Sequence, residues 1–166
     1  MTFGISTATF LQIHVLLSLI GIASGFVVVY GLLGGKPLAG WTALFLITTI
    51  LTSVTGFPLP PFGFDPPRAV GVISLVLLAV AVVALYAFHL SGAWRWLYIV
   101  SATAALYLNV FVGVVQSFSK LSFLQPLAPT QSEPPFLIAQ LAVLIAFVVI
   151  GVLAVMRFRP EMRLRA

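Results

Sequence analysis

Few side chains in this sequence could bind or react with a ligand, and most of those that could are neutral. The chain of 166 residues has three acidic residues and two histidines, and it has no cysteine. The absence of cysteine excludes thiol catalysis, disulfides, thiolate metal sites and iron–sulfur clusters. The best candidates for polar contacts with a ligand are therefore the imidazole of His14 and the amides of Asn109, Gln116 and Gln140.

These four polar side chains lie in long apolar stretches of the sequence. A buried amide or imidazole in hydrocarbon costs several kcal/mol unless it has a hydrogen-bond partner. These polar side chains should therefore have partners. They could line an outward-facing polar pocket for a small ligand or a lipid headgroup. Alternatively, they could form a structural hydrogen-bond network that joins the first, fourth and fifth stretches. The candidate ligand-binding residues are His14, Thr52, Thr55, Asn109, Gln116, Glu133 and Gln140.

None of the common catalytic motifs is present. The sequence lacks the GxSxG nucleophile elbow, the HExxH zinc motif, the GxGxxG dinucleotide motif and the P-loop, so we predict a non-enzymatic protein. Two of the acidic residues have structural explanations, because Asp65 before Pro66 fits a helix N-cap and Thr130-Gln131-Ser132-Glu133 fits a capping box. No acidic residue lies inside an apolar stretch, which argues against a proton- or sodium-coupled pump.

The elements that must hold these residues are membrane-spanning helices. Charged residues make up 7% of the chain and hydrophobic residues 61%, whereas a soluble domain has about 25% charged residues. Because a transmembrane helix needs about 20 mainly apolar residues, we predict an all-α polytopic membrane helical bundle with five transmembrane helices, forming a single domain over residues 1–166. The predicted spans are residues 10–33, 41–57, 68–90, 94–118 and 136–156, followed by a basic tail over residues 157–166.

The segments between the predicted spans contain helix breakers, such as Gly34-Gly35-Lys36-Pro37, and most of the charge. With the N-terminus outside and the C-terminus in the cytoplasm, six basic residues are cytoplasmic and two are outside, as the positive-inside rule requires. The net charge of +5 therefore indicates topology and anionic lipids, not nucleic-acid binding. The same orientation predicts an aromatic belt at the cytoplasmic surface, formed by Trp41, Trp94, Trp96 and Tyr98.

Residues 41–57 form the weakest of the five segments, because they are short and rich in threonine. A re-entrant hairpin there would leave four spans with both termini inside. The number of spans also matters for a haem site. With five spans, His14 and His89 lie near opposite surfaces, about 25 Å apart, which one haem iron cannot bridge. With four spans both histidines fall on one side, where they could ligate the same iron.

Small and polar residues at helical spacing predict the faces on which the spans meet. They recur in the first, third, fourth and fifth spans. The predicted faces are His14, Ser18, Gly21 and Gly25; Ala81, Ala84 and Ala87; Ala102, Ala105, Asn109, Gly113, Gln116 and Lys120; and Gln140, Leu144, Phe147 and Gly151.

Three stretches of the sequence are distinctive: TGFP to GVISL (residues 55–75), LYLNVFV (residues 106–112) and APTQSEPPF (residues 128–136). Together they resemble a family of small, uncharacterised bacterial inner-membrane proteins, and the resemblance covers most of the chain. It implies a location in the bacterial plasma membrane. It brings no known activity and no known site residues.

These observations predict a small integral membrane protein that binds a lipid or a small hydrophobic ligand, or that assists a larger membrane complex. One alternative is an oligomeric transporter or channel for a small solute that uses the same polar residues. A second alternative is a membrane redox protein that binds haem or quinone at His14 or His89. Apart from that alternative we predict no cofactor. The expected partners are membrane lipids, a small hydrophobic ligand, and further copies of the chain or subunits of a membrane complex.

Overall fold

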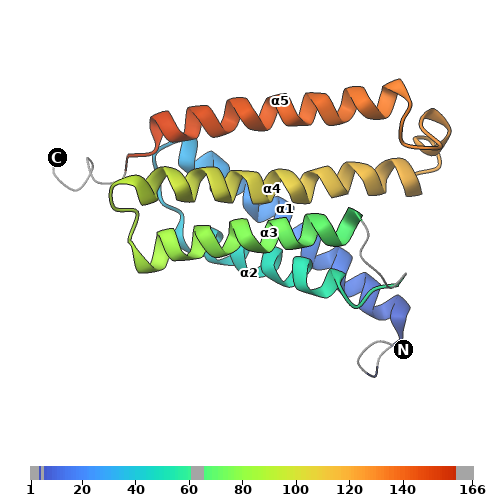
Figure 1. The fold of residues 1–166 in the computed structure, drawn as a ribbon, viewed down its shortest axis with the longest axis horizontal. Coiled ribbons are helices and arrows are strands. Elements are labelled where there is room, and N and C mark those ends of the chain that lie inside the picture. Colours follow the sequence, from blue (N-terminus) through green and yellow to red (C-terminus); the bar gives the residue numbers. More distant parts are fainter. Residues whose placement is uncertain (1–3, 5, 61–65, 160–166) are drawn as a thin grey trace.

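Long helices make up most of the structure, a computed structural model that describes residue 4, residues 6–60 and residues 66–159 (Figure 1). Within these residues there is no strand, so the prediction of an all-α fold is confirmed. In chain order the helices are α1 (Thr7–Leu33), α2 (Ala39–Gly56), α3 (Pro66–Val82), the π-helical turn η1 (Val83–Ala87), α4 (Ala93–Lys120), the short 3-10 helix η2 (Gln125–Leu127) and α5 (Pro134–Arg157).

Among the described residues, five helices are long and apolar enough to cross a membrane, when η1 is counted with α3. They correspond to the five predicted spans. The shortest, α2, has 18 residues and is therefore about 27 Å long, close to the roughly 30 Å thickness of a bilayer's hydrocarbon core. Because α2 is one unbroken helix, the alternative with a re-entrant hairpin and four spans is wrong. The protein is a multi-pass helical membrane bundle.

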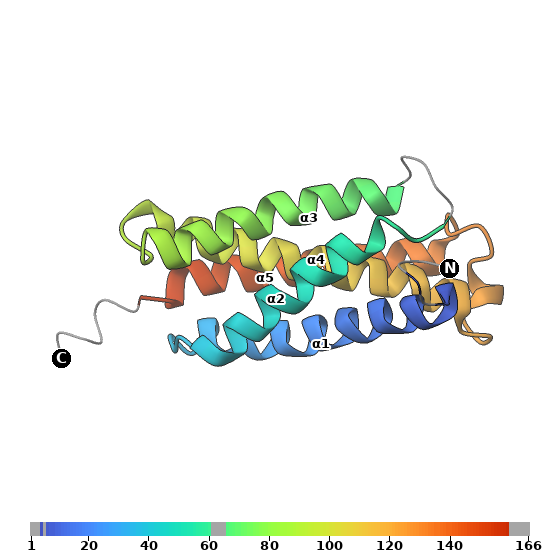
Figure 2. The same cartoon turned by 90° about the horizontal axis from the view of Figure 1, so that it is seen from below.

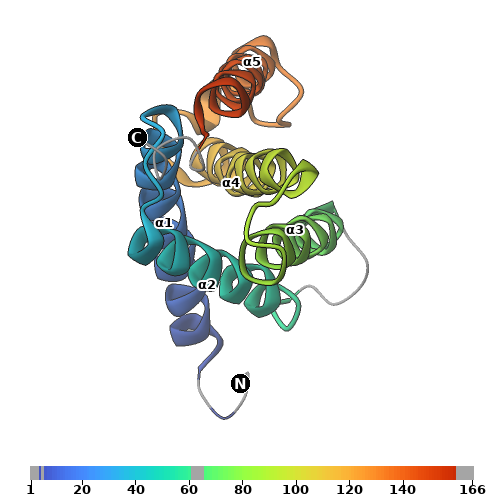
Figure 3. The ribbon, with the colours of Figure 1, turned by 90° about the vertical axis from the view of Figure 1, so that its left-hand side faces the viewer.

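Successive helices run in opposite directions, so α1, α3 and α5 begin at the end of the bundle where α2 and α4 finish (Figure 1). We call the end at which α1, α3 and α5 begin the N-terminal end, and the other the C-terminal end. Helices α1, α2, α3 and α4 contact one another in that order, and α4 also contacts α1, which closes a ring (Figure 3). Helix α2 runs obliquely from α1 toward α3 (Figure 2). Helix α5 packs outside the ring, against α4 and α1.

The ring is packed most closely at the glycines of α1. Gly21 and Gly25 are buried, as the predicted face of the first span requires. A Cβ atom on Gly25 would lie 2.5 Å from Leu106 Cδ1 and 3.0 Å from the Phe45 ring. These side chains of α4 and α2 therefore pack directly on the backbone of α1, where only glycine leaves room for them.

Two arginines bind the ends of neighbouring helices. Arg68, in the first turn of α3, donates hydrogen bonds to the carbonyls of Phe57 and Leu59, where α2 ends. Arg95, in the first turn of α4, donates to the carbonyls of Val155 and Phe158, where α5 ends. The last carbonyls of a helix have no partner within the helix. Each arginine therefore stabilises a helix C-terminus at one end of the bundle.

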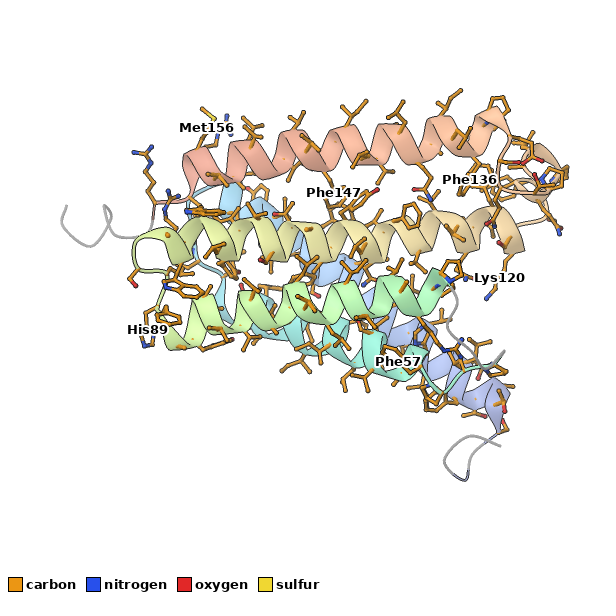
Figure 4. All side chains as sticks on the ribbon, viewed as in Figure 1. Phe57, His89, Lys120, Phe136, Phe147 and Met156 are labelled. Atoms are coloured by element: carbon orange, nitrogen blue, oxygen red, sulfur yellow. The ribbon has the colours of Figure 1, made fainter. Side chains whose placement is uncertain are left out.

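Three of the predicted contact faces include residues that the structure shows to be exposed. Ala87 is exposed because it lies in η1, where the wider π-helical turn rotates it out of the contact. Gln116 and Lys120 are exposed because α1 diverges from α4 toward the N-terminal end (Figures 1 and 3). Leu144 is exposed because α5 buries only a narrow stripe, which includes Phe147. Figure 4 shows Phe147 pointing toward α4 and Met156 pointing away from the bundle.

The predicted helix caps have different outcomes. Helix α5 begins at Pro134 with Glu133 as its N-cap residue, so Thr130 as the N-cap is wrong, although the Thr130 N–H does donate to the Glu133 carboxylate as in a capping box. Helix α3 begins at Pro66, but Asp65, its predicted N-cap, lies outside the described residues. The predicted break after the first span is confirmed, because α1 ends at Leu33 and Gly34 is its C-cap residue.

Candidate functional site

His14 and Thr55 form a polar link between α1 and α2 near the N-terminal end. The distance between His14 Nδ1 and Thr55 Oγ1 is 2.9 Å. The Thr55 hydroxyl donates its own proton to the Leu51 carbonyl, at 2.7 Å. A hydroxyl has one proton, so when this bond is made the Thr55 oxygen accepts from His14, which requires the proton of the neutral imidazole on Nδ1. Nε2 of His14 is left as an acceptor.

Asn109 forms a second link, between α4 and α1. Its Oδ1 accepts a hydrogen bond of 2.8 Å from the Ser18 hydroxyl. Gly21 lies beside this pair, since a Cβ atom there would be 3.1 Å from Asn109 Nδ2 and 3.0 Å from Thr49 Oγ1. Thr49 Oγ1 is buried and has no hydrogen-bond partner among the described residues. Helices α1, α2 and α4 thus meet at a small polar cluster, of which Thr49 is a member that the sequence analysis missed.

The other polar residues of the predicted site lie apart from this cluster. Gln140 Nε2 donates to the Phe111 carbonyl, at 3.2 Å, and links α5 to α4. Thr52 donates to the Thr48 carbonyl of its own helix, at 2.8 Å. Gln116 is exposed on α4. The hydrogen bonds therefore join α1 to α2 and to α4, and separately α4 to α5, instead of joining α1, α4 and α5 in one network.

Glu133 lies in the loop before α5, and its carboxylate is bound by that loop. The Thr130 hydroxyl donates to it at 2.8 Å, and the N–H groups of Thr130 and Ser132 each donate at 3.1 Å. These hydrogen bonds, that of the Thr130 hydroxyl foremost, hold the pKa of Glu133 below its ordinary value of 4.5. Within the described part of the chain, the hydrogen bonds of the seven candidate residues therefore do not connect them into one network.

The two histidines lie at opposite ends of the bundle. His14 is near the start of α1, whereas His89 follows η1 at the C-terminal end (Figure 4). In this arrangement a single iron cannot be bound by both histidines of one chain. His89 and Leu90 have φ angles of 46° and 58°, which are unusual for residues other than glycine. The chain therefore leaves the third span through a strained turn.

A cavity that the sequence analysis did not anticipate lies at the C-terminal end. Its volume is about 240 Å³. It is formed where α1 ends, α2 begins, η1 passes and α4 begins. Apolar side chains make up most of its wall, among them Val28, Leu32, Leu85, Leu90 and Phe158, and the polar side chains on the wall are those of Lys36, Thr42, Tyr86 and Tyr98.

The turn between α1 and α2 forms one wall of the cavity, and Gly31 holds this turn in place. The Lys36 N–H donates to the Gly31 carbonyl at 2.8 Å. A Cβ atom on Gly31 would lie 2.8 Å from both the Lys36 carbonyl oxygen and Leu38 Cδ1. The turn therefore folds directly onto the last turn of α1, with Gly35 at a φ of 64°. This fold places Lys36 and Leu38 at the cavity.

Phe158, which follows α5, forms another part of the cavity wall, and Arg95 holds it in place. Its guanidinium donates to the Val155 carbonyl at 2.9 Å and to the Phe158 carbonyl at 2.6 Å. Phe158 is 1% exposed and lines the cavity. Arg95 thereby holds the residue that follows α5 against the bundle.

Two aromatic residues of the predicted belt are partly or wholly covered. Tyr98 is 3% exposed and lies on the cavity wall with Thr42, so its assignment to the belt is wrong. Its place on α4 turns it toward α2, which the sequence spacing did not reveal. Trp94 is half-buried and stacks on Phe88, with ring centroids 3.9 Å apart. Trp41 and Trp96 are exposed.

Among the described residues, the charges around the cavity have one sign. The charged residues described at this end are Lys36, Arg95, Arg157 and Arg159. Glu133, the one acidic residue that the structure describes, lies at the other end of the bundle. An apolar cavity with a lysine on its wall is suited to binding an amphiphile.

No known protein family, curated protein or solved structure matches this chain.

Proposed function

We propose that this protein binds a lipid or a small hydrophobic ligand, without catalysing a reaction, in the cavity at the C-terminal end of its bundle. The observation that carries the proposal is the cavity of about 240 Å³ with its mainly apolar wall. Drug-sized ligands occupy cavities of about 300–1,000 Å³, so this one suits the end of an acyl chain or a small apolar group. The proposal moves the binding site away from His14 and Asn109, which are bonded to neighbouring helices.

We place the protein in a bacterial inner membrane, with the C-terminal end of the bundle facing the cytoplasm. Four described basic residues lie at that end, and Arg163 and Arg165, together with the acidic Glu161, follow them in the sequence. Arg68 and Lys120 lie at the N-terminal end. The positive-inside rule favours this orientation. The cavity then opens at the level of the inner leaflet.

Cysteine labelling tests the orientation, and the chain has no native cysteine to remove. Ser91 lies in the turn before α4 and Ser132 in the loop before α5, at opposite ends. We expect Ser91→Cys to be labelled by a membrane-impermeant maleimide only after the cells are opened, and Ser132→Cys to be labelled in intact cells. The reverse pattern would overturn the orientation.

Photocrosslinking tests the cavity. The purified protein is reconstituted with a phosphatidylcholine that carries a diazirine at the end of one acyl chain, and crosslinked peptides are mapped by mass spectrometry. We expect enrichment on cavity residues such as Leu85 and Phe158, beyond the labelling of the outer faces. Ala39 lines the cavity, so Ala39→Phe should abolish the enrichment.

Gly40→Phe is the matched control, because a Cβ atom on Gly40 has nothing within 4 Å. It adds the same side chain in the same turn of α2 but away from the cavity, and should leave the crosslinks unchanged. Crosslinks spread evenly over all exposed helix faces, with no difference between the two variants, would disprove the proposed site.

A further inference from the structure

Lys36 combines two properties that a headgroup contact requires. Its side chain is exposed, yet it lines an apolar cavity. Its backbone is held by the hydrogen bond from its N–H to the Gly31 carbonyl, at 2.8 Å. A lysine at a membrane surface places its alkyl stem along apolar groups and its ammonium in the polar interface. The backbone of Lys36 is therefore fixed beside the cavity, and its exposed side chain carries a positive charge there.

The neighbouring charges leave Lys36 without a described acidic partner. The one described acidic side chain, Glu133, is bound within its own loop at the far end. Arg95 donates to two carbonyls, and Arg157 and Arg159, on either side of Phe158, are exposed. A negatively charged headgroup would find cations here and, among the described residues, no carboxylate that repels it.

We infer that the ligand of the cavity is an anionic phospholipid, whose acyl chain enters the apolar space while Lys36 binds its phosphate-bearing headgroup. This inference rests on the proposed function and adds the chemical class of the ligand. The small volume of the cavity, about 240 Å³, accommodates one chain end and leaves the headgroup outside. Lys36 then selects anionic lipids over lipids without net charge that have the same chains.

Native mass spectrometry in mild detergent tests the inference, with phosphatidylglycerol and phosphatidylcholine of identical acyl chains added in competition. We expect the wild type to prefer phosphatidylglycerol by about fivefold for the contact with one lysine. Lys36→Gln should remove the preference, and Lys36→Arg should retain most of it. Lys120→Gln is the control, because it removes the same charge from an exposed position at the other end of the bundle.

The response to Ala39→Phe distinguishes failure of this inference from failure of the proposed function. If both lipids bind equally well and Ala39→Phe abolishes the binding of both, the anionic headgroup is wrong but the cavity still binds lipid. If Ala39→Phe leaves lipid binding unchanged, both proposals are overturned. Equal loss of the preference in Lys36→Gln and Lys120→Gln would show that only the total charge matters, and would also overturn the role of Lys36.

Discussion

The guanidinium of Arg95 on α4 lies 2.6 Å from the carbonyl oxygen of Phe158, the residue that follows α5. The same group binds the Val155 carbonyl one turn earlier. A side chain near the start of α4 thus donates hydrogen bonds to the free carbonyls at the end of α5, which lies much later in the sequence. Because Phe158 also lines the cavity, this contact connects the stability of the bundle to the proposed binding site.

Arg95→Gln should destabilise the protein and weaken lipid binding in the cavity. The hydrogen bonds from a charged donor to two carbonyls are lost, and we expect a loss of about 2 kcal/mol in the free energy of unfolding. Thermal unfolding in detergent measures the first effect and native mass spectrometry the second. Arg68→Gln removes the arginine from the C-terminal end of α2 and should destabilise without affecting lipid binding. Equal effects of both variants on lipid binding would contradict the role of Arg95 in shaping the cavity.

The link between Ser18 and Asn109 should contribute a small, measurable coupling. A double-mutant cycle with Ser18→Ala and Asn109→Leu removes each partner of the 2.8 Å hydrogen bond in turn. Interhelical hydrogen bonds in membranes contribute about 0.6 kcal/mol on average, because the released hydroxyl can bond a carbonyl of its own helix. We expect a coupling free energy of that size from reversible unfolding. Strictly additive effects would show that the two side chains do not interact in the membrane.

His14 should be the tautomer with its proton on Nδ1. The Thr55 hydroxyl already donates to the Leu51 carbonyl, so the hydrogen bond between Thr55 and His14 needs a proton on the imidazole. Nitrogen-15 NMR of labelled histidine distinguishes the two neutral forms. Thr55→Val removes the acceptor and should release His14 from this tautomer, whereas Thr55→Ser should preserve it. A wild-type proton on Nε2 would contradict the assignment.

Gly25 should tolerate a methyl group far less well than Gly113 does. A Cβ atom on Gly25 would overlap the buried side chains of Leu106 and Phe45. Overpacking of this kind costs about 1–3 kcal/mol, so Gly25→Ala should lower the unfolding temperature. On Gly113 the nearest atom to a Cβ is Ile22 Cδ1, at 3.6 Å. Gly113→Ala should therefore be neutral or stabilise the protein by up to about 1 kcal/mol. The opposite order would contradict the packing of α1 against α2 and α4.

The loop before α5 should become less stable in acid. The hydrogen bonds from Thr130 and Ser132 lower the pKa of Glu133 in the folded protein, so they favour the ionised form. Their contribution to stability is complete above the ordinary glutamate pKa of 4.5 and is lost as the pH falls through the lower value of the folded state. An NMR titration of the Glu133 carboxyl carbon measures this pKa. Thr130→Val should raise it, and an unchanged value would contradict the dominant role of the Thr130 hydroxyl.

The local sequence pattern was sufficient to predict the five spans and part of the interface that α1 forms with α2 and α4. Apolar length identified all five helices, and the glycines and prolines between them identified the breaks. The small residues Gly21 and Gly25 correctly marked the face of α1 that packs against α2 and α4. Polar residues were less informative. His14 and Asn109 have interhelical partners, but these are Thr55 and Ser18, and periodicity along one helix cannot specify a partner on another.

The sequence by itself determined that this chain forms five apolar helices with its basic residues mainly at one end, because hydropathy and charge are properties of each segment alone. Only the tertiary structure decided that α5 lies outside the ring, that Tyr98 is buried instead of lying in an aromatic belt, and that a cavity exists at the C-terminal end. These features depend on how residues far apart in the sequence pack against one another. Lys36, Tyr98 and Phe158 come from three different parts of the chain, and the fold brings them to one cavity.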